Sequence, residues 1–385
     1  MPLQRRATAI IGGPQFIVRL AMRPLPLLVL AALLLAPVSS VCSAETDRVT
    51  AATTLAIPFG YDAALPFSDG RAAVKIGTRW GYTDAAGNLV VPPRHAEARP
   101  YADGVAWVLP DVAARWQLLD RDGTVLFTAP YRSVGEFQAG LAAAEEGGCW
   151  GYIDRTGRFV IPTIYDEAAP FAGEYAAVRL GDDWGYVDRS GRQTIAPRYR
   201  LARPYAEGVA AVLDGTRAAA RWAFVDRNGD RVGTTTYDYV GDFSEGRARA
   251  QRRSGARTLW GYLDARGAWT VQPRFADAQD YAEGLAAVSV GEPGNRRWGY
   301  VDRDGAWVIE PRFHEATPFR DGRAAVKLAA RGPASWAYVD RTGAMVTARF
   351  DGAAPYSEGR AVVCRGNCEF DKSRRLDAKF GYVAR

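Results

Sequence analysis

Three cysteines lie beyond residue 44, and two of them are spaced for local chemistry. Cys364 and Cys368 are close enough along the chain to form a small disulfide, which an exported protein would keep oxidised. A metal or redox site is the weaker alternative, because no histidine lies nearby and the spacing is not that of redox Cys-x-x-Cys motifs. We therefore expect a Cys364–Cys368 disulfide, with Cys149 left as a free thiol or available to one of these two.

An aspartate followed three residues later by a glycine recurs eight times, and such a pair could bind calcium or cap a turn. Capping is favoured, because the spacing matches neither a calcium-binding loop nor a glycine-rich nonapeptide repeat. An arginine follows the aspartate in six copies. These arginines could form a rim that binds anionic glycans, lipopolysaccharide phosphates or acidic protein, or they are solvated turn residues paired with nearby aspartates. The six are Arg121, Arg155, Arg189, Arg227, Arg303 and Arg341.

Catalytic residues are scarce, since the chain has only two histidines. His95 stands where other repeats have tyrosine or phenylalanine, which favours a core position, and His314 has no obvious partner. Nucleophile-elbow, phosphate-loop, dinucleotide and zinc motifs are absent from the sequence. We expect no catalysis and no cofactor. The alternative is a polysaccharide-processing enzyme of the cell envelope, with a pair of carboxylates in a ring centre or groove.

The N-terminal 44 residues have the pattern of a secretory signal peptide. Leu27–Ala36 is a run of ten apolar residues preceded by Arg19 and Arg23, and it is too short to span a bilayer. Small residues at Cys42 and Ala44 predict cleavage after Ala44. We therefore expect an exported chain, periplasmic or at the cell surface, with no transmembrane segment after cleavage.

The start, the possible lipidation and the charge of residues 1–44 also follow from the sequence. A start at Met22 would give a signal of ordinary length, and lipidation at Cys42 is the weaker reading because Val41 is bulky. Residues 1–44 contain four arginines and no acid, so they account for most of the net charge of +6. The remaining chain is nearly balanced, and a nucleic-acid partner is not expected.

Tryptophan recurs every 34 to 38 residues, which indicates a repeat architecture. Most copies read Trp-Gly-Tyr-x-Asp, in which Trp and Tyr share one face of a strand and Gly leaves room for a neighbouring strand. The Asp-x-x-Gly turn, a β-branched strand, an acid-Gly turn and a strand with an invariant alanine follow, which predicts three short strands per repeat. The repeats start at Trp80, Trp116, Trp150, Trp184, Trp222, Trp260, Trp298 and Trp336.

This pattern resembles the WG-repeat (tryptophan-glycine β-repeat) family over residues 45–385. The resemblance implies an all-β tandem-repeat fold that mediates interactions, in a family without one shared activity. Repeats that begin at Trp116, Trp222 and Trp336 depart from the pattern because they lack the glycine after tryptophan.

The two ends of the array complement each other. Residues 46–79 form a half-repeat with no Trp-Gly-Tyr strand ahead of it, and residues 380–385 (Phe-Gly-Tyr-Val) are such a strand with nothing after it. Pairing of the two ends would close a propeller-like ring of about nine antiparallel repeats, whereas unpaired ends would leave an open β-solenoid. The sequence leaves both architectures open.

Length variation is confined to the loop before each tryptophan, where repeat proteins commonly bind partners. We expect these loops and the acid-Gly turns on the edge opposite the Asp-x-x-Gly turns. The longest loop, Arg365–Lys379, is the first candidate binding face, through Arg365, Asn367, Asp371, Lys372, Arg374 and Arg375. The sequence thus predicts a monomeric exported scaffold that binds an unknown protein or envelope glycan; a purely structural surface element is a further alternative.

Overall fold

A computed structural model describes residues 55–385 except residues 217–218, 256, 331, 333–334, 367 and 369–377. The fold described here is that of the unit Arg48–Arg385. The expected signal peptide, the alternative start at Met22 and Cys42 lie outside the described residues.

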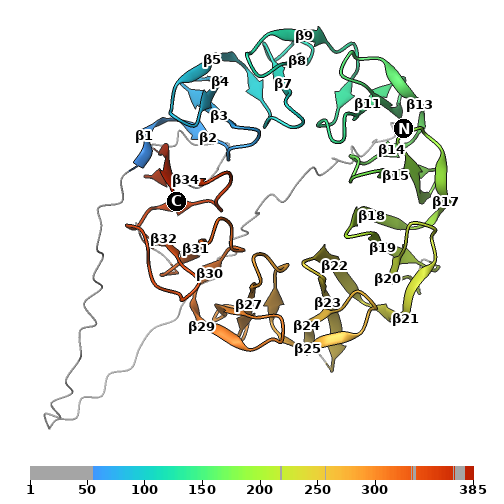
Figure 1. Ribbon diagram of the computed structural model, residues 1–385, viewed down its shortest axis with the longest axis vertical. Helices are drawn as coiled ribbons and strands as arrows, with labels where there is room; N and C mark the ends of the chain where they lie inside the picture. Colours follow the sequence, from blue (N-terminus) through green and yellow to red (C-terminus); the bar gives the residue numbers. More distant parts are fainter. Residues whose placement is uncertain are drawn as a thin grey trace, which may run out of the picture. The chain divides into compact units, whose positions relative to one another are not determined.

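The described unit is all-β and forms nine small antiparallel sheets around a common centre, a nine-bladed β-propeller (Figure 1). Blade 1 contains β2 (Ala63–Ala64), β3 (Arg71–Ile76), β4 (Arg79–Asp84) and β5 (Leu89–His95). Blade 2 contains β6 (Glu97–Ala98), β7 (Ala106–Leu109), β8 (Gln117–Leu119) and β9 (Val125–Thr128). Blade 3 contains β10 (Ser133–Val134), β11 (Ala142–Glu146), β12 (Cys149–Ile153) and β13 (Phe159–Tyr165). Blade 4 contains β14 (Glu167–Ala168), β15 (Tyr175–Leu180), β16 (Asp183–Asp188) and β17 (Gln193–Tyr199).

The second half of the ring continues in the same order. Blade 5 contains β18 (Leu201–Ala206), β19 (Val209–Asp214), β20 (Arg221–Val225) and β21 (Arg231–Tyr237). Blade 6 contains β22 (Tyr239–Ser244), β23 (Arg247–Ser254), β24 (Arg257–Leu263) and β25 (Trp269–Phe275). Blade 7 contains β26 (Asp277–Ala278), β27 (Ala286–Val290), β28 (Arg297–Val301) and β29 (Trp307–Phe313). Blade 8 contains β30 (Glu315–Ala316), β31 (Ala324–Lys327) and β32 (Trp336–Val339), and blade 9 contains β33 (Gly352–Ala353), β34 (Arg360–Arg365), β35 (Lys379–Ala384) and β1 (Leu55–Tyr61).

Eight of the nine sheets have four strands, so the predicted three strands per repeat are one too few. The missed strand is the innermost one, such as β2, which is only two residues long. A strand this short carries no readable alternation of apolar and polar residues, and proline follows it closely at Pro66.

The glycine after tryptophan is required by the outermost strand. A Cβ at Gly81 would lie 2.3 Å from the carbonyl oxygen of Val91, because β5 crosses β4 at a register shift. The three blades that lack this glycine, blades 2, 5 and 8, have a changed outer edge. Blade 2 has the shortened strand β9, blade 5 has a different register in β21, and blade 8 has only isolated bridges.

Tyrosine hydroxyls join successive blades inside the core. The Tyr of the tryptophan-containing strand donates to a backbone carbonyl of the next blade, in or directly after its inner strand, at 2.6–2.8 Å. Burial raises the pKa of Tyr82 and of its counterparts, so these hydroxyls remain protonated donors. In blade 2, where Leu118 replaces the tyrosine, the indole Nε1 of Trp107 makes the equivalent bond to the Gly135 carbonyl. The donors are Tyr82, Tyr152, Tyr186, Tyr262, Tyr300, Tyr338 and Tyr382.

The two ends of the array pair, and the ring is closed. β1 is the outer strand of blade 9 and pairs antiparallel with β35, with Leu55 opposite Val383 and Tyr61 opposite Phe380. The Tyr382 hydroxyl then donates to the carbonyl of Leu65 in blade 1. The closed-ring alternative is therefore confirmed and the open solenoid is wrong.

Deletion of residues 380–385 tests the closure. Without β35, β1 has no partner and blade 9 loses its outer half, so amide hydrogen exchange in residues 55–75 should become much faster. Removal of Arg385 alone, which leaves the β1–β35 register intact, is the control. Unchanged exchange after the six-residue deletion would contradict a closed ring.

His95 gives the fold a specific pH dependence. The side chain is 3% exposed, in the predicted core position opposite Trp80, and burial together with Arg94 lowers its pKa to about 4. The unfolded chain takes up this proton near pH 6.5, so the stability that neutral His95 contributes falls as the pH drops from 6.5 toward 4. By pH 5 the loss should be about 2 kcal/mol. His95→Phe should remove that loss, measured as free energies of unfolding of both chains at pH 7 and pH 5; equal losses would contradict this assignment.

Candidate functional site

The ring has two faces that carry different connections. Along each blade the strands alternate in direction, so the acid-Gly turn and the Asp-x-x-Gly turn lie on one face, here the turn face. The loop before each tryptophan and the connections between blades lie on the other, here the loop face. The prediction that acid-Gly turns share a face with the variable loops is wrong. One strand lies between each acid-Gly turn and the following loop, and the two ends of that strand lie on opposite faces.

On the turn face, carboxylates of seven of the nine blades bind the next blade. The acid of each acid-Gly turn accepts the backbone N–H of the glycine in the following turn, at 2.7–2.9 Å. Both turn residues have positive φ, as in Asp69 (53°) and Gly70 (74°), which exposes this N–H. We name the seven acids the carboxylate ring: Asp69, Asp103, Glu207, Glu245, Glu283, Asp321 and Glu358.

The carboxylate ring crosses the chain closure but is interrupted at two consecutive blades. The Gly70 N–H donates to Glu358 Oε2, which joins blade 9 to blade 1. In the acid position, blade 3 has Ala139 and blade 4 has Gly173. In blade 4, Glu174 also replaces the turn glycine. Within the described residues, no hydrogen bond occupies the N–H of Gly208, which follows this interruption.

The six predicted rim arginines all lie on the turn face, and three of them contact residues of the carboxylate ring. Arg155 and Arg341 donate to the carbonyls of Asp103 and Glu283 in the preceding blade, and Arg303 lies 3.5 Å from Glu245 Oε2. The other three lie on the same face: Arg189 is 3.9 Å from Glu174, Arg121 is near Gly104, and Arg227 is exposed. Binding of an anionic partner by these arginines stays a prediction.

The eight recurring aspartates cap their own turns. In each turn the Asp Oδ1 accepts the N–H groups two and four residues later, as Asp188 does from Ser190 and Arg192. The Ser190 hydroxyl, with the Arg192 side chain, lowers the pKa of Asp188 to about 2. Among the residues that the structure describes, no group of three or more His, Cys, Asp or Glu side chains could hold a metal ion.

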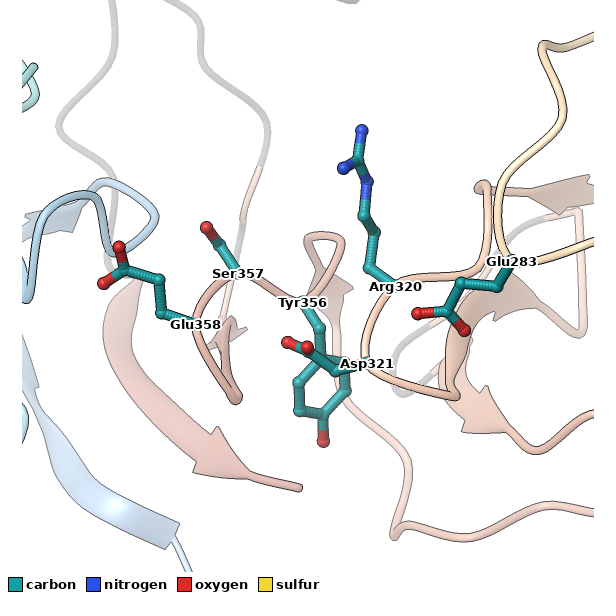
Figure 2. Close-up of a pocket in the computed structure, with 6 residues that line it drawn as sticks. All are labelled: Glu283, Arg320, Asp321, Tyr356, Ser357 and Glu358. Atoms are coloured by element: carbon teal, nitrogen blue, oxygen red, sulfur yellow. The ribbon is translucent and has the colours of Figure 1, made fainter. Parts of the chain in front are cut away.

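A hollow of about 450 Å³ lies on the turn face between the acid-Gly turns of blades 7, 8 and 9 (Figure 2). Glu283, Asp321 and Glu358 line it, and each already accepts a glycine N–H of the next blade. Figure 2 shows the Arg320 side chain extending away from these carboxylates. The carboxylates of this hollow therefore already hold blades together.

On the loop face, the predicted binding residues are described only in part. A disulfide joins Cys364 and Cys368, whose Cα atoms are 6.3 Å apart, and the Arg365 guanidinium stacks 5.0 Å from the ring centre of Phe59. Cys149 is a half-buried free cysteine. Asn367, Asp371, Lys372, Arg374 and Arg375 lie outside the described residues.

The loop face is divided by charge, which the sequence analysis missed. In blades 3 and 4 the loop face carries two arginines, Arg132 and Arg179. They are outnumbered by six acids: Glu145, Glu146, Asp166, Glu167, Asp182 and Asp183. In blades 5 to 7, arginines outnumber acids. The arginines are Arg200, Arg221, Arg252, Arg253, Arg257, Arg296 and Arg297. The acids are Asp214, Asp238, Asp277 and Glu292. Because these residues belong to separate repeats, only the ring order brings each set together.

Comparisons with known proteins agree with this architecture. A family model described as "WG containing repeat" matches residues 54–77, 80–109, 150–182, 184–215, 222–254, 260–292, 298–329 and 336–367, which is more than half of the chain. No curated protein matches the chain. A crystal structure of "the eukaryotic initiation factor" is similar at 9% identity and a TM-score of 0.55, covering 78% of this chain and 90% of that one, which supports the fold alone.

Two further solved structures are more distant. TolB from Acinetobacter baumannii has 13% identity and a TM-score of 0.27, covering 63% of this chain and 76% of that one. A quinonprotein alcohol dehydrogenase-like protein from Bacteroides thetaiotaomicron has 11% identity and a TM-score of 0.34, covering 82% and 84%. Among the described residues, no helix is long and apolar enough to cross a membrane.

Asp103→Ala tests the carboxylate ring. The change removes the 2.7 Å bond from the Gly140 N–H, and alanine tolerates the turn, because Ala139 has the same conformation in blade 3. We expect a loss of about 1–3 kcal/mol in the free energy of unfolding, measured by denaturant titration. Asp122→Ala, at an exposed turn position, is the control. Equal stabilities of the two variants would contradict a structural role for the carboxylate ring.

Proposed function

Because the chain belongs to the WG-containing-repeat family, we propose that it is an exported binding scaffold of the cell envelope. It holds a protein or glycan partner on the loop face of its propeller and catalyses no reaction. The ring supplies a rigid platform, and the loops supply the recognition surface.

The observation that carries this proposal is the confinement of length variation to the loop face. The loop between the second and third strands differs in length between blades: it is residues 77–78 in blade 1, residues 291–296 in blade 7 and residues 110–116 in blade 2. Turn-face connections have constant length and are occupied by capping aspartates and the carboxylate ring. A face that varies while the fold around it stays constant is where repeat proteins place specificity.

The charge division of the loop face supports a partner of matching charge. Within the described residues, Glu146, Asp182 and Asp183 of the acidic half have no ion-pair partner, and neither do Arg252 and Arg253 of the basic half. Surface charges that lack internal partners are free to steer and orient a ligand.

Export is supported by the N-terminal residues and by the disulfide. The apolar run Leu27–Ala36 with its flanking arginines is the pattern that directs secretion. A disulfide between Cys364 and Cys368 fits an oxidising compartment such as the periplasm or cell surface.

Crosslinking with mass spectrometry in the native envelope tests the proposal. Crosslinks to a specific partner should concentrate on loop-face residues of blades 5 to 7. Replacement of residues 291–296 by Gly-Thr, the short loop that blade 1 has at residues 77–78, should reduce those crosslinks at least tenfold, because it removes recognition surface and leaves the strands intact.

Arg303→Ala, on the turn face, is the matched control and should leave the crosslinks unchanged. Crosslinks that concentrate on the turn face, or no specific partner at all, would overturn the proposal. Hydrolysis of envelope glycans by the purified chain, abolished by Glu283→Gln in the hollow of Figure 2, would instead support the polysaccharide-processing enzyme.

A further inference from the structure

The outer strand of blade 5 differs from most other outer strands at Gly233, Thr235 and Thr236. Where five other blades have valine or isoleucine, β21 has Gly233, and where four have Pro-Arg, it has Thr235-Thr236. The arginine of that pair has a structural task elsewhere: Arg198 and Arg312 donate to the carbonyls of Gly229 and Gly343 in the next blade. Blade 5 lacks this arginine, the proline before it and the branched apolar side chain.

The departure changes how blade 6 lies against blade 5. A Cβ at Gly233 would be 2.6 Å from the Arg266 carbonyl oxygen, so the turn of blade 6 packs directly on the β21 backbone. Tyr237, at the end of β21, bonds through its hydroxyl to the Gly267 carbonyl in place of the missing arginine. The interface therefore holds without the Pro-Arg pair, and space remains where that pair would lie.

That space is a hollow of about 270 Å³ near the loop face, between blades 5 and 6. Its lining combines an aromatic side chain, hydroxyls and charges: Trp269, Thr235, Thr236, Asp238, Arg221 and Arg252. Trp269 is half-buried and held by an edge contact with Tyr237, with ring centres 6.0 Å apart. The volume lies just below the usual range for ligand pockets, and is sufficient for one sugar ring rather than a large cofactor.

The charges in the hollow favour an anionic ligand. Asp238 is engaged, since its Oδ2 accepts the Arg253 N–H and its Oδ1 lies 3.9 Å from Arg221. Arg252 is exposed and has no ion pair among the residues that the structure describes. A free guanidinium beside two threonine hydroxyls suits a carboxylate and its neighbouring hydroxyls, while an indole face suits the C–H face of a pyranose.

We propose that this hollow binds a uronate, a sugar unit that carries a carboxylate, within an acidic polysaccharide. The inference deepens the proposed loop-face function by naming a ligand class. The inference does not depend on the cellular compartment of the protein, because the site lies within the interface between blades 5 and 6. Divergence of one repeat from its neighbours at positions that line a cavity is the pattern expected of a functional site.

Calorimetric titration of the purified full chain tests the inference. The probes are a glucuronate trisaccharide, a glucose trisaccharide and inorganic phosphate. The glucuronate trisaccharide should bind at least tenfold more tightly than either other probe, because it alone presents both the sugar ring and the carboxylate.

Two variants locate the site. Thr235→Pro combined with Thr236→Arg restores the residues of the neighbouring blades, fills the hollow and should abolish binding. Arg252→Ala should weaken binding of the glucuronate trisaccharide at least tenfold, and Arg115→Ala, an exposed arginine of blade 2, should leave it unchanged. Unfolding midpoints within a few degrees of the parent chain confirm that the variants fold.

Each contrary outcome overturns the inference. Equal binding by the parent chain and the Pro-Arg variant would place the ligand elsewhere, and equal affinity for phosphate would reduce the site to a general anion site. If the parent chain binds no probe while loop-face crosslinks to a partner persist, the uronate site fails and the proposed scaffold function stands.

Discussion

The pairing of β1 with β35 is the constraint on which the rest of the structure depends. The hydrophobic clusters lie between adjacent blades, as between blades 9 and 1 and between blades 1 and 2, so each blade depends on contacts with two neighbours. Without the terminal pairing, the first and last blades would each lack one neighbour, and the edge of β35 would be open. With it, the Tyr382 hydroxyl and the Glu358 carboxylate complete the two series of inter-blade bonds across the ends of the chain. One strand pair thus gives every blade two neighbours.

The sequence predicts those features of the fold that lie within one repeat. The period, the strand of Trp-Gly-Tyr, the role of its glycine and the capping aspartates all follow from residues a few positions apart. Contacts between repeats are harder, because Asp69 and its donor Gly104 look like two independent turn residues. Nothing local indicates that one accepts a bond from the other. The same holds for the charge division of the loop face, which exists only once the ring order is known.

The candidate sites were predictable to different degrees. The Cys364–Cys368 disulfide follows from spacing alone, and the rim arginines could be placed on one face from the turn motif. The acid-Gly turns on that face were misplaced, although one strand separates each of them from the loop before the next tryptophan. The hollow between blades 5 and 6 could have been found from the sequence by asking which repeat breaks the pattern: Thr235-Thr236 replaces Pro-Arg there, and the glycine after Trp222 is absent as well.

The carboxylate ring has a direction, because every acid reaches forward to the next blade and none reaches back. Each such blade therefore contributes one acceptor and one donor. A gene that gained or lost a whole repeat by recombination would keep these groups balanced, with no orphaned carboxylate or amide. The number of blades is therefore not determined by the sequence of any single repeat.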